Sequence, residues 1–252
     1  MLLNSIISGN GSPVALLHGL FGSAPNLGTI ARHLATGYRT IALDLRNHGA
    51  SPHAPTMSYT EMAGDVRETL ASLDAWPAAL IGHSMGGKVA MHLALEAPEV
   101  PKLMVLDIAP VAYPPAFRTF AAAMQAIRVA VDLTRAQADQ MLAPVVTEPT
   151  VRAFLLQNFR FGTQPGWRIG LQEIANSLPE IEGWEAPEGA VYRGPCLLAF
   201  GARSTYNLPE HRPAIRALFP AARFATVKNA GHWLHAENPL ATATLAWDFL
   251  AA

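Results

Sequence analysis

One short segment of the sequence carries the pattern of a reactive serine. Gly82-His83-Ser84-Met85-Gly86 follows an apolar run and opens a stretch rich in Ala, Leu and Met. A strand, a sharp turn with small flanking residues and a helix together present the serine of G-x-S-x-G as a nucleophile. The helix N-terminus also favours the negative charge that develops there. We therefore predict that Ser84 is a nucleophile; the alternative is a glycine-rich turn whose serine only caps the helix.

The second requirement is a general base, because a serine hydroxyl attacks poorly without one within hydrogen-bond distance. His232 is the candidate, since it follows Gly231 in a loop after the last apolar run. A serine that precedes its histidine in the chain matches the order found in hydrolases with this turn. His235 is the competing histidine, but it lies near the start of the next helix, where packing or hydrogen bonding is its expected role.

The base needs a carboxylate on its second ring nitrogen, and two residues are candidates. The segment after the penultimate strand is a common place for it, yet residues 201–207 contain no Asp or Glu, and Glu210 comes only in the next helix. The preceding strand, Leu103–Leu106, ends directly at Asp107. Because these strand ends are expected to be neighbours, we predict Asp107 as the acid and keep Glu210 as the alternative. Otherwise Asp107 orders the chain beside Pro110.

Backbone N–H groups must stabilise the negative oxygen of a tetrahedral intermediate. One candidate donor is Met85, the residue after the nucleophile. The second is expected in a loop after an early strand, and residues 18–23 read His-Gly-Leu-Phe-Gly-Ser. The two glycines allow the backbone to approach the substrate oxygen closely. We assign the second donor to Leu20 and expect His18 to fix this loop; a simple turn at the strand end is the alternative.

A further polar loop, Asp44–Gly49, also follows an apolar run. The preferred interpretation is structural, with Asp44 ordering the neighbouring backbone. No spacing of Cys, His and Asp is typical of a metal site, and no glycine-rich nucleotide-binding motif is present. The sequence therefore predicts neither a metal nor a cofactor.

The candidate residues follow short apolar runs that are typical of buried strands. These runs are Val14–Leu17, Ile41–Leu45, Ala79–Gly82, Leu103–Leu106, Cys196–Phe200 and Phe224–Val227. Helical patterns are found at Glu61–Leu73, Met85–Glu96, Pro209–Phe219 and Pro239–Leu250. Such alternation predicts an α/β fold with a mostly parallel sheet and helices on both faces. In such a sheet, active residues gather at the C-terminal ends of the strands.

Residues 111–193 break the alternation, because they contain helical patterns and no convincing strand. We expect a helical cap inserted into a core that comprises residues 1–110 and 194–252. The expected helices are Pro115–Ala130, Thr134–Leu142, Thr150–Gln157 and Trp167–Leu178. Aromatic residues of the cap and the core are candidates to line an apolar pocket, although any of them can instead serve only in packing. The pocket candidates are Phe21, Phe117, Phe120, Phe154, Trp184 and Trp233.

The composition is that of a globular chain. Of its 252 residues 50% are hydrophobic and 15% are charged, with a net charge of −1 and no basic block that predicts a nucleic-acid partner. No apolar run approaches the ~20 residues of a membrane span. The first ten residues lack the basic region of a secretory signal, and a lone cysteine, Cys196, cannot form an internal disulfide. We expect a cytoplasmic protein, without membrane insertion, that binds a small molecule as a monomer or a dimer.

Five segments together resemble the YbfF-like esterases of the α/β-hydrolase superfamily, which are related to abhydrolase-domain protein 11. They are His18–Ser23, Asp44–Gly49, Gly82–Lys88, Asp107–Tyr113 and Gly231–Glu237. The resemblance implies a capped α/β-hydrolase fold and carboxylesterase activity on short acyl esters, with acyl-CoA thioesters hydrolysed by some members. It also implies an acid at Asp107, and Ser204 fits the same subgroup. Only Leu2–Ile7 precedes the first apolar run, so a reduced first hairpin is expected.

The prediction is therefore a serine carboxylesterase that needs no cofactor. Ser84 attacks an acyl carbonyl, His232 takes and returns the proton, and water hydrolyses the acyl-enzyme. A haloperoxidase without a cofactor or a carbon–carbon hydrolase uses the same residues, and fold alone does not separate these reactions. A ligand receptor with a slow hydrolase pocket is the third interpretation. A haloalkane dehalogenase is disfavoured, because it needs Asp in place of Ser84.

Overall fold

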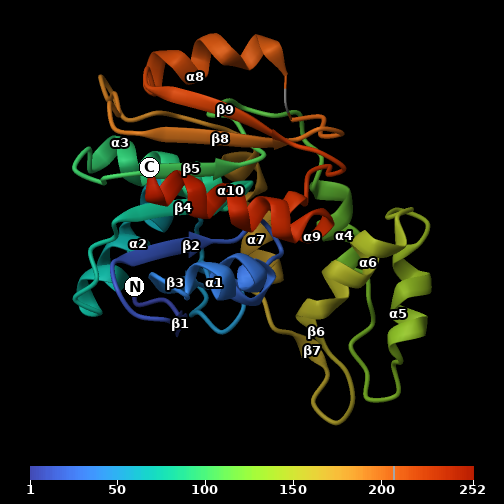
Figure 1. The fold of residues 1–252 in the computed structure, drawn as a ribbon. Helices are drawn as coiled ribbons and strands as arrows, with labels where there is room; N and C mark the ends of the chain where they lie inside the picture. Colours follow the sequence, from blue (N-terminus) through green and yellow to red (C-terminus); the bar gives the residue numbers. More distant parts are fainter. Residues whose placement is uncertain (207) are drawn as a thin grey trace.

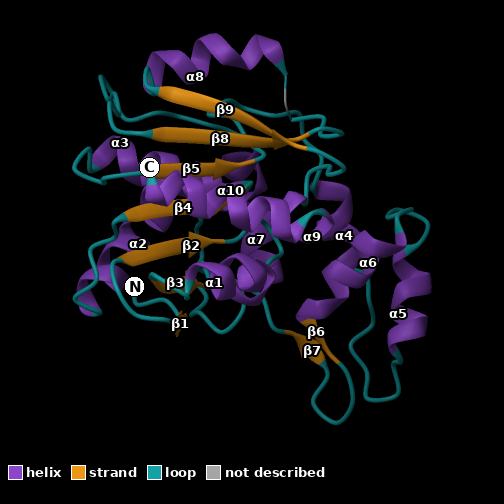
Figure 2. Ribbon diagram, in the orientation of Figure 1, coloured by secondary structure: helices purple, strands orange, loops and turns teal. Residues whose placement is uncertain are grey.

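The computed structural model describes residues 1–206 and 208–252, in which seven strands form a central sheet (Figures 1 and 2). The strands are β1 (Ser5–Ser8), β2 (Pro13–Leu17), β3 (Arg39–Leu43), β4 (Ala79–His83), β5 (Leu103–Leu106), β8 (Cys196–Gly201) and β9 (Ala222–Val227). Their order is β1-β3-β2-β4-β5-β8-β9. Only β1 is antiparallel to its neighbour, and all the other pairs in this described sheet are parallel. The predicted α/β architecture is confirmed.

Helices cover both faces of the sheet, because successive side chains of a strand point to opposite sides. The helices of the core are α1 (Gly28–Leu34), α2 (Tyr59–Ser72), α3 (Met85–Glu96), α8 (Arg212–Leu218), α9 (Leu234–Glu237) and α10 (Pro239–Ala251). On β2, Ala15 and Leu17 join one core cluster with residues of α2 and α3, whereas Val14 and Leu16 join a second cluster with residues of α1 and α10. The central strands β2, β4, β5 and β8 are thus buried between two helical layers, whereas the edge strand β1 is partly exposed.

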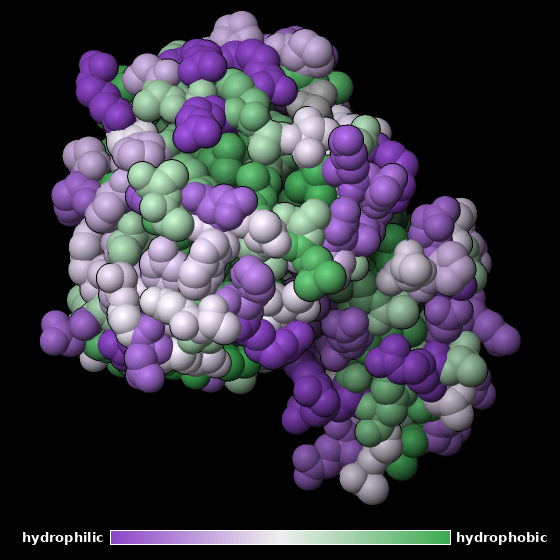
Figure 3. Space-filling model, viewed as in Figure 1, coloured by the Kyte–Doolittle hydropathy of each residue, from purple (hydrophilic) through white to green (hydrophobic). Residues whose placement is uncertain are grey.

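Between β5 and β8 the chain leaves the sheet and forms a largely helical insertion (Figure 1). Its elements are α4 (Arg118–Gln125), α5 (Arg135–Leu142), α6 (Pro149–Leu155), β6 (Phe159–Arg160), β7 (Gly166–Trp167) and α7 (Leu171–Glu182). Part of the insertion stands out from the body of the molecule as a lobe (Figure 3). The division of the chain at residues 110/111 and 193/194 stays a prediction.

The insertion differs in detail from the expected pattern. The expectation of no strand is wrong, because β6 and β7 form a small antiparallel pair and α7 begins only at Leu171. Strands of two residues are too short to show a period of hydrophobicity. The first expected helix is also shorter than predicted, since α4 begins at Arg118, after Pro114 and Pro115. Proline lacks the N–H that an α-helix interior requires.

Candidate active site

Ser84 forms the turn between β4 and α3. Its backbone angles are φ 51° and ψ −121°, which a residue with a side chain rarely adopts. The turn is crowded: a Cβ on Gly82 would collide with the backbone of Gly86, and a Cβ on Gly86 with the backbone of Leu17 and His18. The requirement for small residues on both sides of the serine is therefore confirmed.

Three side chains meet at the C-terminal edge of the sheet. The hydroxyl Oγ of Ser84 lies 3.1 Å from Nε2 of His232, and Nδ1 of the same ring lies 2.8 Å from Oδ2 of Asp107. Ser84 follows β4, Asp107 follows the neighbouring strand β5, and His232 comes from the loop after β9. The arrangement can move a proton from the hydroxyl to the imidazole, while the carboxylate stabilises the imidazolium that forms.

The carboxylate of Asp107 is fully buried and is held by further donors. Its Oδ1 accepts a hydrogen bond of 2.9 Å from the N–H of Gly201, and its Oδ2 accepts another from the hydroxyl of Ser204. Both donors come from β8 and the loop that follows it, which is the segment without an acid of its own. The loop therefore contributes to the site by positioning the carboxylate of the preceding strand.

The competing candidates lie elsewhere. Glu210 is exposed on a 3₁₀-helix, Pro209–His211, and within residues 1–206 and 208–252 it makes no hydrogen bond to His232. His235 is buried in α9 and packs edge-on against His83, with 4.3 Å between ring centroids. Burial lowers the pKa of His235 to about 4, so its imidazole is neutral. The packing role expected for His235 agrees with this position.

His83 connects this packing to the loop of His232. Its Nε2 lies 2.9 Å from the backbone carbonyl oxygen of His232. Because a carbonyl oxygen only accepts, His83 donates this hydrogen bond. Burial and the neighbouring imidazoles hold the pKa of His83 well below its ordinary value. The loop that carries His232 is therefore attached to β4, the strand that precedes Ser84.

The loop after β2 is fixed by two buried, neutral histidines. His18 Nε2 accepts from the N–H of Leu45 at 3.0 Å, and its Nδ1 donates to the carbonyl oxygen of Gly19 at 2.8 Å. His48 Nε2 accepts from the N–H of Phe21 at 3.1 Å, and burial lowers the pKa of His48 to about 3. A ring nitrogen that accepts a hydrogen bond must be unprotonated. The role expected for His18 therefore agrees with the structure, and His48 shares it.

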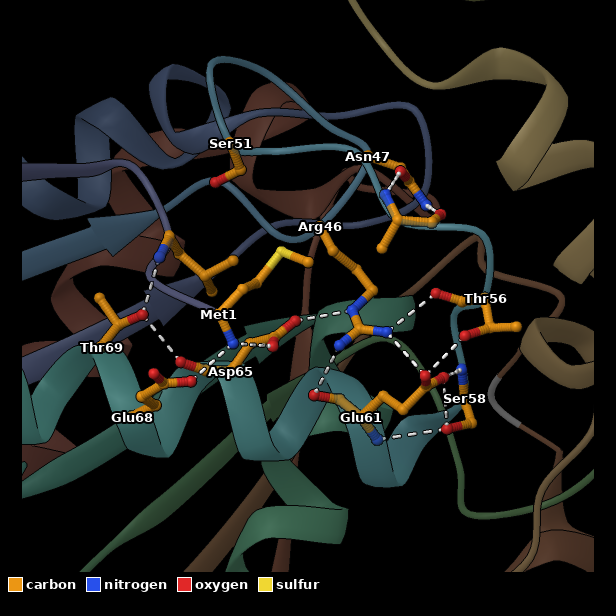
Figure 4. Close-up of polar contacts among 12 residues, drawn as sticks. Met1, Arg46, Asn47, Ser51, Thr56, Ser58, Glu61, Asp65, Glu68 and Thr69 are labelled. Atoms are coloured by element: carbon orange, nitrogen blue, oxygen red, sulfur yellow. Dashed lines mark hydrogen bonds and ion pairs between the residues drawn. The ribbon is translucent and has the colours of Figure 1, made fainter.

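The loop Asp44–Gly49 supports these histidines by polar contacts. Asp44 accepts hydrogen bonds from the N–H groups of Ala24 at 2.7 Å and Ala50 at 2.9 Å. Arg46 forms ion pairs with Asp65 at 2.6 Å and Glu61 at 3.0 Å on α2 (Figure 4). The structural interpretation of Asp44 agrees with these contacts.

The two candidate oxyanion donors, Leu20 and Met85, border the same small cavity as Ser84. Met85 is the first residue of α3, and the first N–H groups of a helix have no acceptor within it. Leu20 follows the His18–Gly19 turn and borders the space next to Ser84. Their role as donors stays a prediction.

A cavity of about 240 Å³ opens beside Ser84, and most of the predicted pocket residues line it. These are Phe21, Phe117, Phe120, Phe154 and Trp233. The prediction for Trp184 is wrong. Its ring packs against the rings of Tyr59 and His92, with 5.6 Å and 6.2 Å between ring centroids. Trp184 takes this position because it follows the end of α7 that lies against α2 and α3. An aromatic residue type predicts burial but not the side to which the ring turns.

Tyr206 belongs to the site but was not among the predicted residues. Its ring is stacked on the imidazole of His232, with 4.3 Å between centroids and 24° between planes. A tyrosine in a loop carries no distinctive sequence signal. Its position two residues after Ser204, in a segment expected to face the base, is the one indication that could have identified it.

The described part of the chain contains no group of three or more His, Cys, Asp or Glu residues arranged to hold a metal ion. None of its helices has both the length and the apolar character needed to cross a membrane. Burial raises the pKa of the Cys196 thiol to about 12, so the thiol is unreactive near neutral pH.

Comparisons with known proteins agree with the motifs. The model of the alpha/beta hydrolase family matches residues 14–245. An sn-1-specific diacylglycerol lipase, ABHD11, from Mus musculus is 41% identical over 248 residues, covering 94% of this chain and 80% of that protein. Esterase YbfF of Escherichia coli is 40% identical over 232 residues, covering 91% of this chain and 89% of that protein. A marine microorganism esterase superposes with a TM-score of 0.94 at 32% identity, covering 98% of this chain and 99% of that one.

Proposed function

This chain belongs to the α/β-hydrolase family and is a hydrolase of ester bonds, and we propose that Ser84, His232 and Asp107 perform the hydrolysis. One observation carries the proposal: the uninterrupted contact from Asp107 through His232 to Ser84, at 2.8 and 3.1 Å. These distances are within the range in which a base can take a proton from a nucleophile. The relatives named esterase and lipase support the same reaction class.

The reaction has two halves. Ser84 Oγ attacks the acyl carbonyl while Nε2 of His232 takes its proton, and the oxyanion accepts hydrogen bonds from Leu20 and Met85. His232 then donates the proton to the leaving alcohol, and an acyl-enzyme remains. A water molecule repeats these steps and releases the acid. Asp107 holds Nδ1 of His232 throughout and stabilises the imidazolium.

The proposed substrates are small acyl esters. Acyl-CoA thioesters follow the same steps, with a thiol as the leaving group. The apolar cavity beside Ser84 supports this choice, because ligand cavities are mostly apolar with a few polar groups that orient the reacting bond. We propose that Phe21, Phe117, Phe120, Phe154 and Trp233 contact the substrate there.

A fluorophosphonate probe together with a panel of p-nitrophenyl esters and acyl-CoA thioesters tests the proposal. We expect the probe to label the wild-type enzyme at Ser84, and Ser84→Ala to lose both labelling and hydrolysis. Ser72→Ala is the control, because Ser72 is exposed on α2. Hydrolysis by Ser84→Ala at more than about a tenth of the wild-type rate would contradict a loss expected to be ~10⁶-fold.

The same assay separates the alternative functions. Peracid formation faster than ester hydrolysis would favour a haloperoxidase, and cleavage of carbon–carbon bonds without ester turnover would favour that hydrolase. Tight binding of a ligand with nearly no multiple turnover would favour a receptor.

A further inference from the structure

We infer that Ser84 stands between two chambers of unequal size, and that the smaller one receives the acyl group while the larger one receives the alcohol. The large chamber is the cavity bordered by His232, Phe120, Phe154 and Trp233. The small chamber is bordered by Met85, Lys88, Ile108 and Tyr113. This inference rests on the proposed function, because it uses the roles of Ser84 and His232.

The sizes differ enough to decide what each chamber can hold. The small chamber has a volume of about 30 Å³ and the large one about 240 Å³. A water-sized group needs about 10–15 Å³ by this measure. The small chamber therefore has room for roughly two or three such groups, as in a short acyl chain. Both chambers meet at Ser84, and Leu20, Phe117 and Tyr206 form the boundary between them.

The position of His232, which must protonate the leaving oxygen, determines where the alcohol and the acyl chain of the substrate lie. The attacked carbon carries an oxyanion, an acyl chain and a leaving oxygen, and the leaving oxygen must take its proton from His232. Among the residues that the structure describes, His232 borders the large chamber and not the small one. The alcohol therefore departs through the large chamber. The acyl chain points the other way, beyond Met85, into the small chamber.

Buried hydrogen bonds hold the walls of the small chamber in place. Lys88, almost fully buried on α3, donates to the carbonyl oxygen of Gly183 at 2.6 Å. Tyr59 on α2 donates to the carbonyl oxygen of Ile181 at 2.5 Å. The N–H of Tyr113 donates to the carbonyl oxygen of Glu182 at 2.9 Å. Moving these walls apart to admit a longer chain would break buried hydrogen bonds, which is costly.

The walls of the large chamber are of another kind. Phe117 and Phe120 pack edge to face, with 6.3 Å between ring centroids. Phe154 packs against Trp233, with 6.1 Å between ring centroids. Such ring contacts can be rearranged without leaving a polar group unpaired. We therefore expect a sharp limit on acyl length and a broad tolerance for the alcohol.

Two ester series test the assignment through kcat/KM. The first varies the acyl chain of p-nitrophenyl esters from acetate to octanoate, and the second varies the alkyl alcohol of acetate esters from methyl to octyl. We expect kcat/KM to fall about tenfold or more between butyrate and hexanoate, the scale of methylene discrimination in a closed pocket. In the alcohol series we expect it to stay level or rise. The reverse pattern would overturn the assignment while leaving Ser84 as nucleophile, and hydrolysis of no ester would overturn both proposals.

Matched variants locate the limit. Ile108→Ala enlarges the small chamber and should raise the hexanoate to butyrate ratio about tenfold, with the alcohol profile unchanged. Phe154→Ala enlarges the large chamber and should change only the alcohol profile. Ile108 is buried, so the milder Ile108→Val is the second variant if Ile108→Ala does not fold, and it should shift the ratio in the same direction. Labelling of Ser84 by the fluorophosphonate verifies that each variant is folded. An unchanged acyl limit in a labelled Ile108 variant would overturn the inference.

Discussion

The C-terminal edge of the sheet and the insertion between β5 and β8 face each other across the candidate site, and different forces hold them. On the edge, hydrogen bonds place Ser84, His232 and Asp107 at defined distances. In the insertion, aromatic rings such as Phe117 and Phe120 meet edge to face. Proton transfer needs atoms placed within a fraction of an ångström, which directional bonds provide. Selection of a substrate needs an apolar volume of the right shape, which packing alone provides.

The histidines are also distributed unequally between the sheet edge and the insertion. Residues 111–193 contain none of the nine histidines of the chain. His18, His48, His83, His232 and His235 all lie on or beside the sheet edge. The imidazoles near Ser84 therefore come from the core, and none comes from the insertion.

The largest effect is expected from the base. His232→Ala removes the proton acceptor, and we expect turnover to fall ~10⁶-fold with little change in melting temperature, because the ring is partly exposed. Steady-state hydrolysis of p-nitrophenyl acetate and thermal unfolding measure the two quantities. His53→Ala, at an exposed position, is the control. Comparable losses of turnover in His232→Ala and His53→Ala would mean that His232 is not the general base.

The next effect is expected from the acid. Asp107→Asn should leave the fold intact but allow the wrong tautomer of His232, with a loss on the order of 10⁴-fold in turnover. Glu210→Gln should change little, because that side chain is exposed. Rates and melting temperatures should be measured together. A large loss of stability in Asp107→Asn with turnover nearly intact would support a structural role for the carboxylate instead.

Acid should destabilise the edge through its neutral histidines. The ordinary pKa of a histidine is about 6.5, and that of His48 in the folded protein is about 3. Between these values the unfolded chain binds a proton that the folded chain excludes. The contribution is therefore fully present above about pH 6.5 and is lost as the pH falls toward 3, on the order of a few kcal/mol.

Urea unfolding between pH 7.5 and 4 checks this expectation. His48→Gln keeps a polar side chain that does not titrate, so the decline in the free energy of unfolding with falling pH should be shallower than in the wild type. If the free energy of unfolding declines equally steeply with falling pH in His48→Gln and in the wild type, another group on the edge or in the insertion causes the acid sensitivity.

The smallest effects are expected in the insertion, where two aromatic residues should behave oppositely. Phe120 borders the large chamber, so Phe120→Ala should change the preference among alcohols about tenfold while the preference among acyl chain lengths stays the same. Trp184 packs against α2 and α3, so Trp184→Ala should cost roughly 1–3 kcal/mol of stability and leave the preference unchanged. A change of preference in Trp184→Ala alone would reverse the assignment of these rings.

The contrast between the two regions also explains what the sequence could predict. On the edge, backbone chemistry restricts the residue types: the turn at Ser84 needs Gly82 and Gly86, and a buried strand that ends in Asp107 needs a partner for its carboxylate. Such restrictions are visible in one sequence. The strands and the meeting of Ser84 with His232 and Asp107 were therefore predictable.

In the insertion, the same residue types serve packing and binding. Phe154 and Trp184 are both aromatic and both partly buried, yet only Phe154 borders the cavity beside Ser84 in the described structure. Strands of two residues, such as β6 and β7, show no period. The stacking of Tyr206 on His232 depends on loops that are close in space but far apart in the chain. Such features depend on tertiary packing, which no local pattern encodes.

The order in which the chain contributes its site has a consequence during synthesis. Ser84 and Asp107 follow the adjacent strands β4 and β5, whereas His232 comes from the loop after β9. Proteins are made from the N-terminal end, and N-terminal parts fold first. A nascent chain that has emerged only through β8 carries Ser84 and Asp107 but lacks His232, the proposed base. With this mechanism, we expect hydrolysis to begin only when the last part of the core has been translated and β9 has paired with β8.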